Sequence, residues 1–295
     1  MADREDIQEL REHARQIRSK VLEMGIRSGG GHLAPGFSNT DILVALYDKI
    51  LRFDPKNQDW EDRDRFVLSK GHGCMPLYAI LADKCFFNES HLDTFCQPGS
   101  ILGCHADRNL IPGVEVTTGS LGLGLPVAVG MAFAARHYKK NHRIYVLCGD
   151  GECQEGTIWE SAMYAGSNGF DNLTVIVDNN GYGATARLSD TADVYPLAEK
   201  LRAFNFSVRE VNGHDFRELL PALRAVPYEK GRPSAIVAHT TKGKGVSIME
   251  EDYARGDPRW HYRQPKTQEE ARIARRDLTF PLEENGDLNE QIRSN

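Results

Sequence analysis

The sequence predicts an α/β fold, namely a doubly wound and mostly parallel sheet with helices on both faces. A continuous apolar segment at 144–148 precedes a helical pattern at about 155–165 and a second apolar segment at 173–177. Strand, helix and strand at this spacing form a βαβ unit, whose parallel strands are buried on both faces. The same alternation then repeats as a strand near Val208, a helix at 215–226 and a strand at 235–239.

The N-terminal part of the chain adds helices to this sheet. Apolar residues at helical spacing predict an amphipathic helix over 3–24, which the glycine-rich segment 28–32 ends. Asn39 or Thr40 is expected to cap a second helix that runs through Leu51. The remaining elements are a strand at 66–69, a helix that ends at 85, and a helix that opens at 117–124 and ends near 137.

Length and patterning predict one large domain over 1–265 and a peripheral C-terminal tail over 266–295. The chain has 295 residues, of which 40% are hydrophobic, and this is enough for one large buried core. The tail is charged, and its first part has a helical pattern.

The composition disfavours several classes of partner. Lys plus Arg is 36 and Asp plus Glu is 42, so the net charge is −6 and predicts neither nucleic acid nor an anionic membrane as partner. No apolar segment approaches the ~20 residues that span a bilayer, and the charged N-terminus lacks the apolar core of a signal peptide. The six cysteines include no C-x-x-C pair. We therefore expect a cytoplasmic protein with free thiols.

Two oxygen-bearing side chains follow neighbouring strands of the predicted sheet. Asp150 lies at the end of one strand, and Asn180 lies at the end of the next. Taken singly, Asp150 is a turn residue or helix cap and Asn180 is part of an Asn-Gly turn. Taken together they predict a Mg²⁺ site, because ligands bind beyond the carboxyl ends of parallel strands and Mg²⁺ prefers oxygen. Gly149 and Gly151 would let a diphosphate approach the backbone closely.

These residues and several others resemble the transketolase family of thiamine diphosphate enzymes. Gly149-Asp150-Gly151, followed after thirty residues by Asn180, is similar to the thiamine diphosphate motif. The similarity runs from about residue 15 to 265, in the order and spacing of the family. Its other motifs are Ser69-Lys70-Gly71-His72-Gly73, Pro112-Gly113-Val114-Glu115, Thr118-Gly119-Ser120-Leu121-Gly122, Gly149-Asp150-Gly151-Glu152-Cys153-Gln154-Glu155-Gly156 and Thr241-Lys242-Gly243-Lys244-Gly245.

The resemblance implies a set of metal and cofactor ligands. Asp150, Asn180 and the backbone carbonyl of Tyr182 would hold Mg²⁺, for which Ca²⁺ or Mn²⁺ could substitute. Thiamine diphosphate would contact further residues, namely His72, Gly119, Ser120, Leu121, Gly149, Gly151, Glu152 and Glu155. Glu155 resembles a buried carboxylate that links the two active sites of a dimer, although a helix acid stabilised by the dipole fits it equally well.

Four of the ten histidines occupy motif positions, and the resemblance gives them catalytic roles. His72 would touch the diphosphate, while His32, His105 and His261 would contact the sugar or relay protons. Histidine suits this work because it carries protons near neutral pH. Lys242 and Lys244 would face either anionic substrate or solvent.

The resemblance implies transfer of a two-carbon ketol unit from a ketose or ketose phosphate donor to an aldose acceptor. In the family, a second pyrimidine-binding domain supplies the glutamate that activates the cofactor. The chain ends at Asn295 and is too short to hold that domain, so we expect a partner subunit in an α₂β₂ assembly. Departures from the family pattern, such as Cys104-His105-Ala106 in place of Gly-His-Pro, put the ordinary pentose phosphate substrate in doubt.

Three other interpretations remain open from the sequence. The first is the α subunit of a 2-oxo acid dehydrogenase or decarboxylase, which shares the metal motif but not the motifs of His72 and His105. The second is a catalytically silent cofactor-binding regulatory subunit, which would have lost the channel histidines. The third is a nucleotide-binding Rossmann protein, but Gly119, Gly122 and Gly124 do not follow the G-x-G-x-x-G order.

Overall fold

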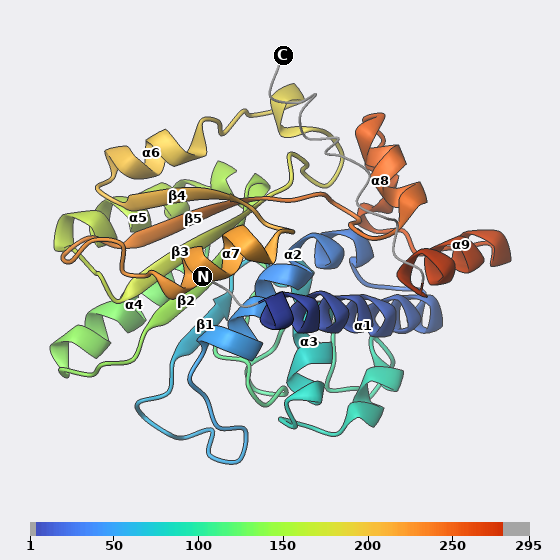
Figure 1. The fold of residues 1–295 in the computed structure, drawn as a ribbon, viewed down its shortest axis with the longest axis horizontal. Coiled ribbons are helices and arrows are strands. Elements are labelled where there is room, and N and C mark those ends of the chain that lie inside the picture. Colours follow the sequence, from blue (N-terminus) through green and yellow to red (C-terminus); the bar gives the residue numbers. More distant parts are fainter. Residues whose placement is uncertain (1–3, 280–295) are drawn as a thin grey trace.

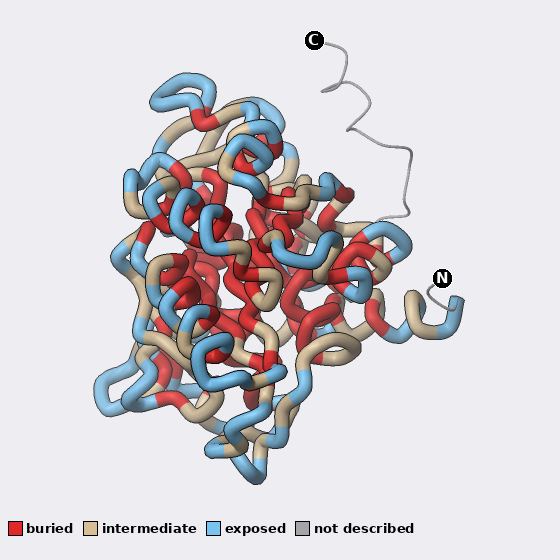
Figure 2. Tube along the Cα trace, turned by 90° about the vertical axis from the view of Figure 1, so that its left-hand side faces the viewer, coloured by how far each residue is buried: buried red, intermediate tan, exposed pale blue. Residues whose placement is uncertain are grey.

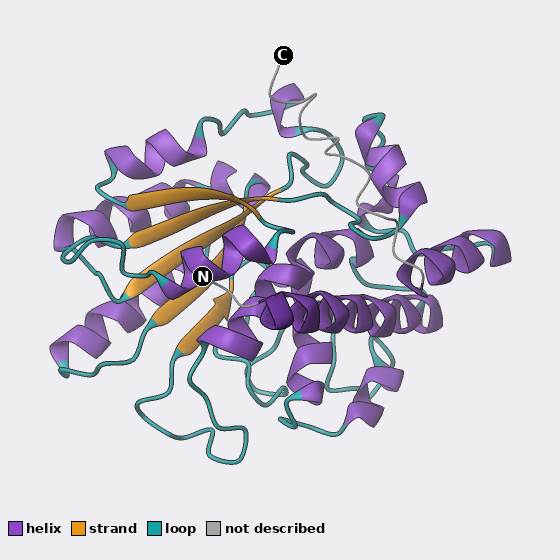
Figure 3. Cartoon of the chain, in the orientation of Figure 1, coloured by secondary structure: helices purple, strands orange, loops and turns teal. Residues whose placement is uncertain are grey.

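A parallel five-stranded sheet forms the centre of the protein, in a computed structural model that describes residues 4–279 (Figures 1 and 3). The strand order is β1-β2-β3-β5-β4, and every neighbouring pair is parallel. The strands are β1 (Arg65–Leu68), β2 (Ile144–Gly149), β3 (Leu173–Asn179), β4 (Ser207–Asn212) and β5 (Ser234–His239). The predicted α/β fold with a parallel sheet is confirmed.

Helices cover both faces of this sheet. The α-helices are α1 (Arg4–Ser28), α2 (Leu33–Ala45), α3 (Cys74–Asp83), α4 (Gly124–His137), α5 (Gly156–Asn168), α6 (Leu197–Ala203), α7 (Phe216–Arg224), α8 (Ser247–Ala254) and α9 (Gln268–Thr279). One π-helical turn and several 3₁₀ turns supplement them, at Leu46–Ile50 (π), Gly71–Gly73, Glu89–Thr94, Gly151–Gln154, Leu188–Asp190 and Arg259–His261.

Alternate residues of each strand pack into two separate hydrophobic cores, one on each face of the sheet. For this reason the central strands are apolar throughout. On β2, Ile144, Val146 and Cys148 pack with α4, α5 and α6, whereas Tyr145 and Leu147 pack with α1, α2, α3 and α7. Successive side chains of a strand point to opposite faces, so a sheet covered on both sides has no polar face. Figure 2 shows the buried trace running through the middle of the molecule between exposed outer loops.

Several predicted boundaries are wrong, and the first helix after the glycine-rich turn shows why. This helix, α2, begins at Leu33 instead of near residue 40, because Pro35 is tolerated in a first turn and every residue of the helix is buried. Asn39 and Thr40 therefore cap nothing: Asn39 Nδ2 donates to Gly73 O at 3.3 Å, and Thr40 Oγ1 donates to Gly36 O at 2.9 Å. Similarly, 117–123 is a loop and α4 begins only at Gly124.

The short helices α6 and α8 are absent from the predicted pattern, since seven or eight residues show too little periodicity. The helix expected at the start of the tail forms as α9, which packs against α1 through Arg275 and Glu23 at 2.7 Å. The domain boundary at 265 stays a prediction, and residues 280–295 lie outside the described part. Within 4–279, no helix combines the length and apolar character needed to cross a bilayer.

Candidate active site

The carboxyl ends of β2 and β3 bring Asp150 next to the turn that contains Asn180. Gly149 on β2 pairs in register with Asp178 on β3, so the residues that follow them emerge side by side. Asp150 Oδ1 accepts from Gly151 N–H at 2.8 Å, and Oδ2 accepts from Gly181 N–H at 2.5 Å. The carboxylate of Asp150 thus holds the backbone of the residue that follows Asn180.

A buried lysine, Lys242, contacts the turn that follows Asn180, and the sequence did not predict this contact. Lys242 is only 3% exposed, and its ammonium donates to the carbonyl oxygens of Tyr182 at 3.1 Å and Gly183 at 2.7 Å. Lys242 therefore does not face solvent. Its pKa falls to about 7, first because of burial and second because of the nearby Lys70 charge. No local pattern predicts this contact, since the surrounding glycines are equally compatible with an exposed loop.

Burial controls the charge of Asp150 as well. Loss of solvent, followed by repulsion from Asp178, raises the pKa of Asp150 to about 6. The Gly181 N–H, the Lys242 ammonium and the Gly151 N–H lower this pKa, but they only partly offset the burial. A buried carboxylate whose pKa stays raised despite these groups favours a cation, because an added cation would restore its ionised form.

The oxygens at this edge fit a hard divalent cation. Asp150 supplies a carboxylate, Asn180 an amide and Tyr182 a backbone carbonyl that already accepts from a positively charged group. Among residues 4–279, no cluster of three or more His, Cys, Asp or Glu side chains is arranged to hold a metal ion. A cation here would therefore need amide, carbonyl and ligand oxygens, which is the chemistry that Mg²⁺ accepts.

Beneath this edge lies a buried ion pair between Lys70 and Asp178. Lys70 is 1% exposed and donates both to Asp178 Oδ2 and to Pro35 O, the latter at 3.1 Å. Asp178 also accepts from Ser38 Oγ at 2.6 Å and from the Thr240 hydroxyl. Burial opposes the ionisation of Asp178, but Lys70 and these hydrogen bonds outweigh it, so the Asp178 pKa is lowered. This network joins α2 and β3 to the segments that follow β1 and β5, next to the predicted site.

The four predicted histidines converge from four distant segments of the chain. The ring centroid of His32 lies 5.6 Å from that of His72, 5.4 Å from that of His105 and 5.4 Å from that of His261. Tyr262, which is 64% exposed, lies 5.0 Å from His32 and 4.5 Å from His261. Tertiary folding alone produces this cluster, because 229 residues separate its first and last members (261 − 32).

These histidines are held in their neutral form. Burial is the main cause in each case: it lowers the pKa of His32 to about 4 and of His261 to about 2, and it also lowers the pKa of His72 and His105. The Lys242 charge lowers the pKa of His32, His72 and His261 further, which places these rings within its electrostatic reach. Within the described residues, Nδ1 of His32 and Nδ1 of His261 have no hydrogen-bond partner.

The loop before α4 is fixed against the end of β1. Thr118 Oγ1 donates to Leu68 O at 2.8 Å, and Gly71 has room only for hydrogen, because a Cβ there would meet Gly119 N at 2.7 Å. Gly119 in turn adopts a φ of 146° beside the His105 ring. Ser120 is exposed and Leu121 is partly buried at the tip of this loop. The loop therefore presents its backbone next to the histidine cluster.

Glu152 and Glu155, both predicted to bind cofactor, lie in opposite environments. Glu152 is 1% exposed, and its oxygens accept from Ser69 Oγ, Gly122 N–H at 2.8 Å and Gly149 N–H at 3.1 Å. Its contacts are thus with protein and connect three segments of the site. Glu155 is exposed in this single chain instead of buried. Its predicted burial would need a second chain.

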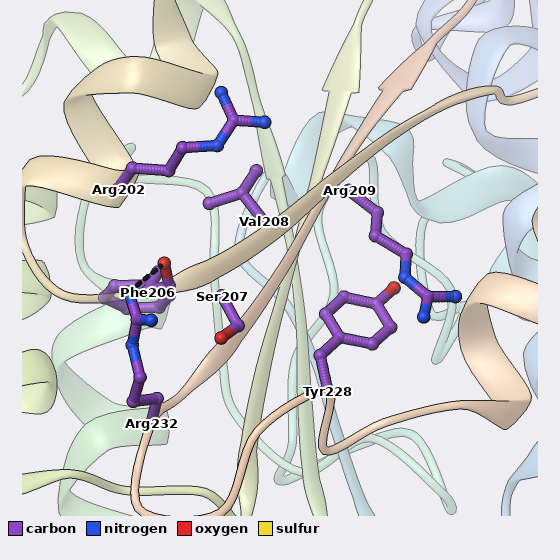
Figure 4. Close-up of a pocket in the computed structure, with 7 residues that line it drawn as sticks. All are labelled: Arg202, Phe206, Ser207, Val208, Arg209, Tyr228 and Arg232. Atoms are coloured by element: carbon purple, nitrogen blue, oxygen red, sulfur yellow. Dashed lines mark hydrogen bonds between the residues drawn. The ribbon is translucent and has the colours of Figure 1, made fainter.

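A separate cavity lies at the opposite end of the edge strand β4. It has a volume of about 260 Å³ and is lined by Arg202, Phe206, Ser207, Val208, Arg209, Tyr228 and Arg232 (Figure 4). Ser207 begins β4, so this cavity is at the amino end of the strand, whereas ligands of such sheets bind at the carboxyl ends. None of the predicted site residues lines it.

Comparison with known proteins agrees with this arrangement. Residues 10–279 match the family described as "Transketolase, thiamine diphosphate binding domain". The 6-deoxy-6-sulfo-D-fructose transketolase subunit of Clostridium sp. (strain MSTE9) is 40% identical over 242 residues, which are 82% of this chain and 88% of that protein. An apulose-4-phosphate transketolase subunit of Actinobacillus succinogenes is 39% identical over 262 residues, which are 88% of this chain and 93% of that protein.

Longer transketolases match over a part of their length. The rat enzyme is 35% identical over 88% of this chain but only 40% of its own length. The structure of transketolase from Leishmania mexicana superposes with a TM-score of 0.85 and 31% identity, covering 95% of this chain and 42% of that one. The chain thus spans about two fifths of these proteins. It belongs to the family of transketolase thiamine diphosphate-binding domains, as the sequence motifs predicted.

Proposed function

We propose that this chain is the diphosphate-binding subunit of a two-component transketolase, which transfers a two-carbon ketol unit from a ketose or ketose phosphate to an aldose. One observation carries the proposal: the oxygens of Asp150, Asn180 and Tyr182 lie near a cluster of four neutral histidines. Lys242 connects the two, because it contacts the Tyr182 carbonyl and lowers the pKa of three of the histidines.

Asp150, Asn180 and the Tyr182 carbonyl would hold Mg²⁺, or Ca²⁺ or Mn²⁺ in its place, against the diphosphate. Bound thiamine diphosphate supplies a thiazolium carbon that can become a nucleophile for a ketose carbonyl. Gly149 and Gly151 would leave room for the diphosphate beside the backbone, and His72 would donate to its oxygens. The loop at Gly119, Ser120 and Leu121 would contact the cofactor through its backbone. Glu152 would act indirectly, by holding the Gly122 and Gly149 amides in place.

The histidines are suited to bind a sugar and to move its protons. A neutral imidazole can accept a hydroxyl proton at one nitrogen and donate from the other. His32 and His261 each keep a buried Nδ1 without a partner among the described residues, so a substrate hydroxyl would satisfy an otherwise costly polar atom. His105, which is partly exposed, would contact the substrate from the same cluster.

A second subunit would complete the site with the pyrimidine-binding domain and its glutamate, in an α₂β₂ assembly. Two relatives of similar length are named as transketolase subunits, and this chain corresponds to about two fifths of the longer enzymes. The structure offers a surface for such a partner, which we call the α4–α5 face. It consists of exposed apolar residues at the start and along the helices: Leu123, Val127, Phe133, Met163 and Tyr164.

Two aromatic residues of the α4–α5 face lie around a shared neighbour. Phe133 is 50% exposed and Tyr164 is 49% exposed, and both pack against Phe170, at 6.4 Å and 6.0 Å between ring centroids. Contiguous exposed apolar residues of this kind mark interaction surfaces. Glu155 lies at the exposed N-terminus of α5 on the same pair of helices, so a subunit that covered this face would also bury that carboxylate.

We expect Phe133→Asp to weaken assembly with the partner by at least about tenfold, because a charge would be buried at an apolar contact. Sedimentation of the mixed subunits would measure this effect. Leu110→Asp is the matched control, since Leu110 is 53% exposed but belongs to a loop and to neither α4 nor α5. Equal assembly of both variants would argue against the α4–α5 face as the contact.

The substrate class follows from the relatives and from the site. The relatives are named for apulose 4-phosphate and 6-deoxy-6-sulfo-D-fructose, both of which are anionic sugars. We propose a sugar or sugar phosphate as substrate for this chain, in a specialised pathway. The protein would act in the cytoplasm without nucleic acid or membrane.

The function is tested first by binding and then by turnover. Titration calorimetry should detect binding of thiamine diphosphate that depends on Mg²⁺, and no binding of NAD. The isolated chain should not transfer ketol units, whereas the chain mixed with its partner, sought in the adjacent reading frame, should convert one of a panel of ketose donors and aldose acceptors. Full turnover by the isolated chain, or decarboxylation of a 2-oxo acid by the pair, would contradict the proposal.

A further inference from the structure

Three cysteines meet beside the histidine cluster, although they are far apart in the sequence. Cys74 begins α3, while Cys96 and Cys104 belong to the loop that follows the 3₁₀ turn Glu89–Thr94. Cys96 N–H donates to Leu102 O at 2.8 Å, so the loop folds back on itself and brings Cys96 towards Cys104. Cys74 Sγ lies 3.3 Å from Cys104 O, at the base of the group.

Cys96 and Cys104 lie on the same folded loop, close enough for Cys104 to affect the ionisation of Cys96. The pKa of Cys96 is raised to about 11, first by burial, then by repulsion from the thiolate form of Cys104 and by a side-chain hydrogen bond with Cys104. Cys74 is fully buried, and its pKa is raised to about 12, which holds it as an unreactive thiol. Cys96 is only partly buried, and its backbone bond to Leu102 holds it on the same folded loop as Cys104, so it is the thiol placed to react with Cys104.

Cys104 is the accessible member of the group, and it has a base next to it. It is exposed to solvent, and its Sγ lies 3.3 Å from Nδ1 of His105. An imidazole nitrogen at this distance can take the thiol proton as the sulfur reacts, and reactive cysteines are those with both exposure and such a neighbour. By contrast Cys148 and Cys153 are buried in the core, and Cys85 is exposed without a thiol beside it.

We propose that Cys96 and Cys104 are a reversible redox pair, which a hydroperoxide converts into a disulfide. The sulfur of Cys104 attacks the terminal peroxide oxygen, so that an S–O bond forms, the O–O bond breaks and the alcohol or water leaves with a proton. The Cys96 sulfur then attacks the resulting sulfenic acid, and the hydroxyl leaves as water with the Cys96 proton. Two thiols lose two electrons, which reduce one hydroperoxide.

The oxidation state of this pair would change the contacts of His105. In the reduced chain the Cys104 thiol contacts His105 Nδ1, and formation of the disulfide removes the thiol hydrogen from that contact. Gly103 lies directly before Cys104 and Gly99 lies at the tip of the loop with a φ of 82° and no neighbour within 4 Å of an added Cβ. These glycines give the loop the freedom to bring the sulfurs to bonding distance.

The pair is tested on the full-length reduced chain with hydrogen peroxide as the oxidant. After treatment the remaining thiols are alkylated, and the chain is digested without reductant by chymotrypsin, which cuts beside Leu102 between the two cysteines. Mass spectrometry should find the Cys96 and Cys104 peptides joined by a disulfide, with a loss of two thiols per chain. Dithiothreitol should restore both thiols.

Two variants separate this pair from ordinary surface oxidation. Cys96→Ser should form no disulfide and should accumulate a sulfenic acid at Cys104 that dimedone traps. Cys85→Ser, the matched control, should form the Cys96–Cys104 disulfide as the unmodified chain does. The proposal is overturned if Cys96 and Cys104 remain unlinked under conditions that oxidise Cys85, or if Cys104 links to Cys74 or to another molecule instead.

Discussion

Asp150→Asn should weaken Mg²⁺-dependent binding of thiamine diphosphate by about 100-fold or more, since loss of even an outer-shell partner of a metal ligand costs about 10- to 100-fold. The substitution keeps the size of the side chain but removes the charge that would bridge the protein to the cation. Titration calorimetry with and without Mg²⁺ would measure the loss. Asp190→Asn, which makes the same change at an exposed position, should bind as the unmodified chain does.

The fold itself should survive this change. Because burial raises the pKa of Asp150 from 3.8 to about 6, the ionised form is disfavoured in the folded chain without a cation, and removal of its charge should maintain or increase thermal stability. A loss of binding with preserved unfolding temperature would distinguish a missing ligand from a damaged fold. Unchanged Mg²⁺-dependent binding in Asp150→Asn would contradict the proposed metal site.

The same pKa predicts how binding depends on pH. A proton and a divalent cation compete for the Asp150 carboxylate, so the affinity for Mg²⁺ and cofactor should fall as the pH drops below about 6. Asp150→Asn should lose this dependence, because its side chain does not titrate.

The second large effect is expected from the buried Lys70–Asp178 pair. Asp178→Asn should lower the free energy of unfolding by about 3–5 kcal/mol, because it leaves the Lys70 ammonium buried without its countercharge. Urea unfolding with an unchanged m value would measure the loss. Adding Lys70→Met to Asp178→Asn should recover part of it, because the uncompensated charge is then removed.

An exposed ion pair provides the comparison. Glu269 and Arg272 form a 2.6 Å pair on the surface of α9, and Glu269→Gln should leave the urea midpoint nearly unchanged, because solvent screens an exposed pair. Since Asp178 has a lowered pKa, its contribution should be present above its ordinary value of 3.8 and lost as the pH falls through the lower folded value. A loss of under about 1 kcal/mol in Asp178→Asn would contradict the role assigned to this pair.

Local sequence patterns were enough to predict the elements that follow the strand–helix–strand alternation. The apolar segments at β2 and β3 identified a parallel sheet, and the position of Asp150 and Asn180 directly after them predicted that both would reach one edge. The start of α2 was predicted wrongly because Asn39 and Thr40 resemble capping residues, whereas their hydrogen bonds are made inside a buried helix. Burial of the whole helix is a tertiary property that no local pattern contains.

The sequence by itself determined the alternation of strands and helices around β2 and β3, the family, and the oxygen and imidazole groups available for chemistry. Only the tertiary structure decided that Lys242 donates to the Tyr182 carbonyl predicted to bind the metal, that Lys70 pairs with Asp178, and that the loop of Cys96 folds back towards Cys104. The physical reason is that hydrophobic periodicity is set by neighbours along the chain. The charge state and partner of a buried polar group depend instead on segments that only folding brings together.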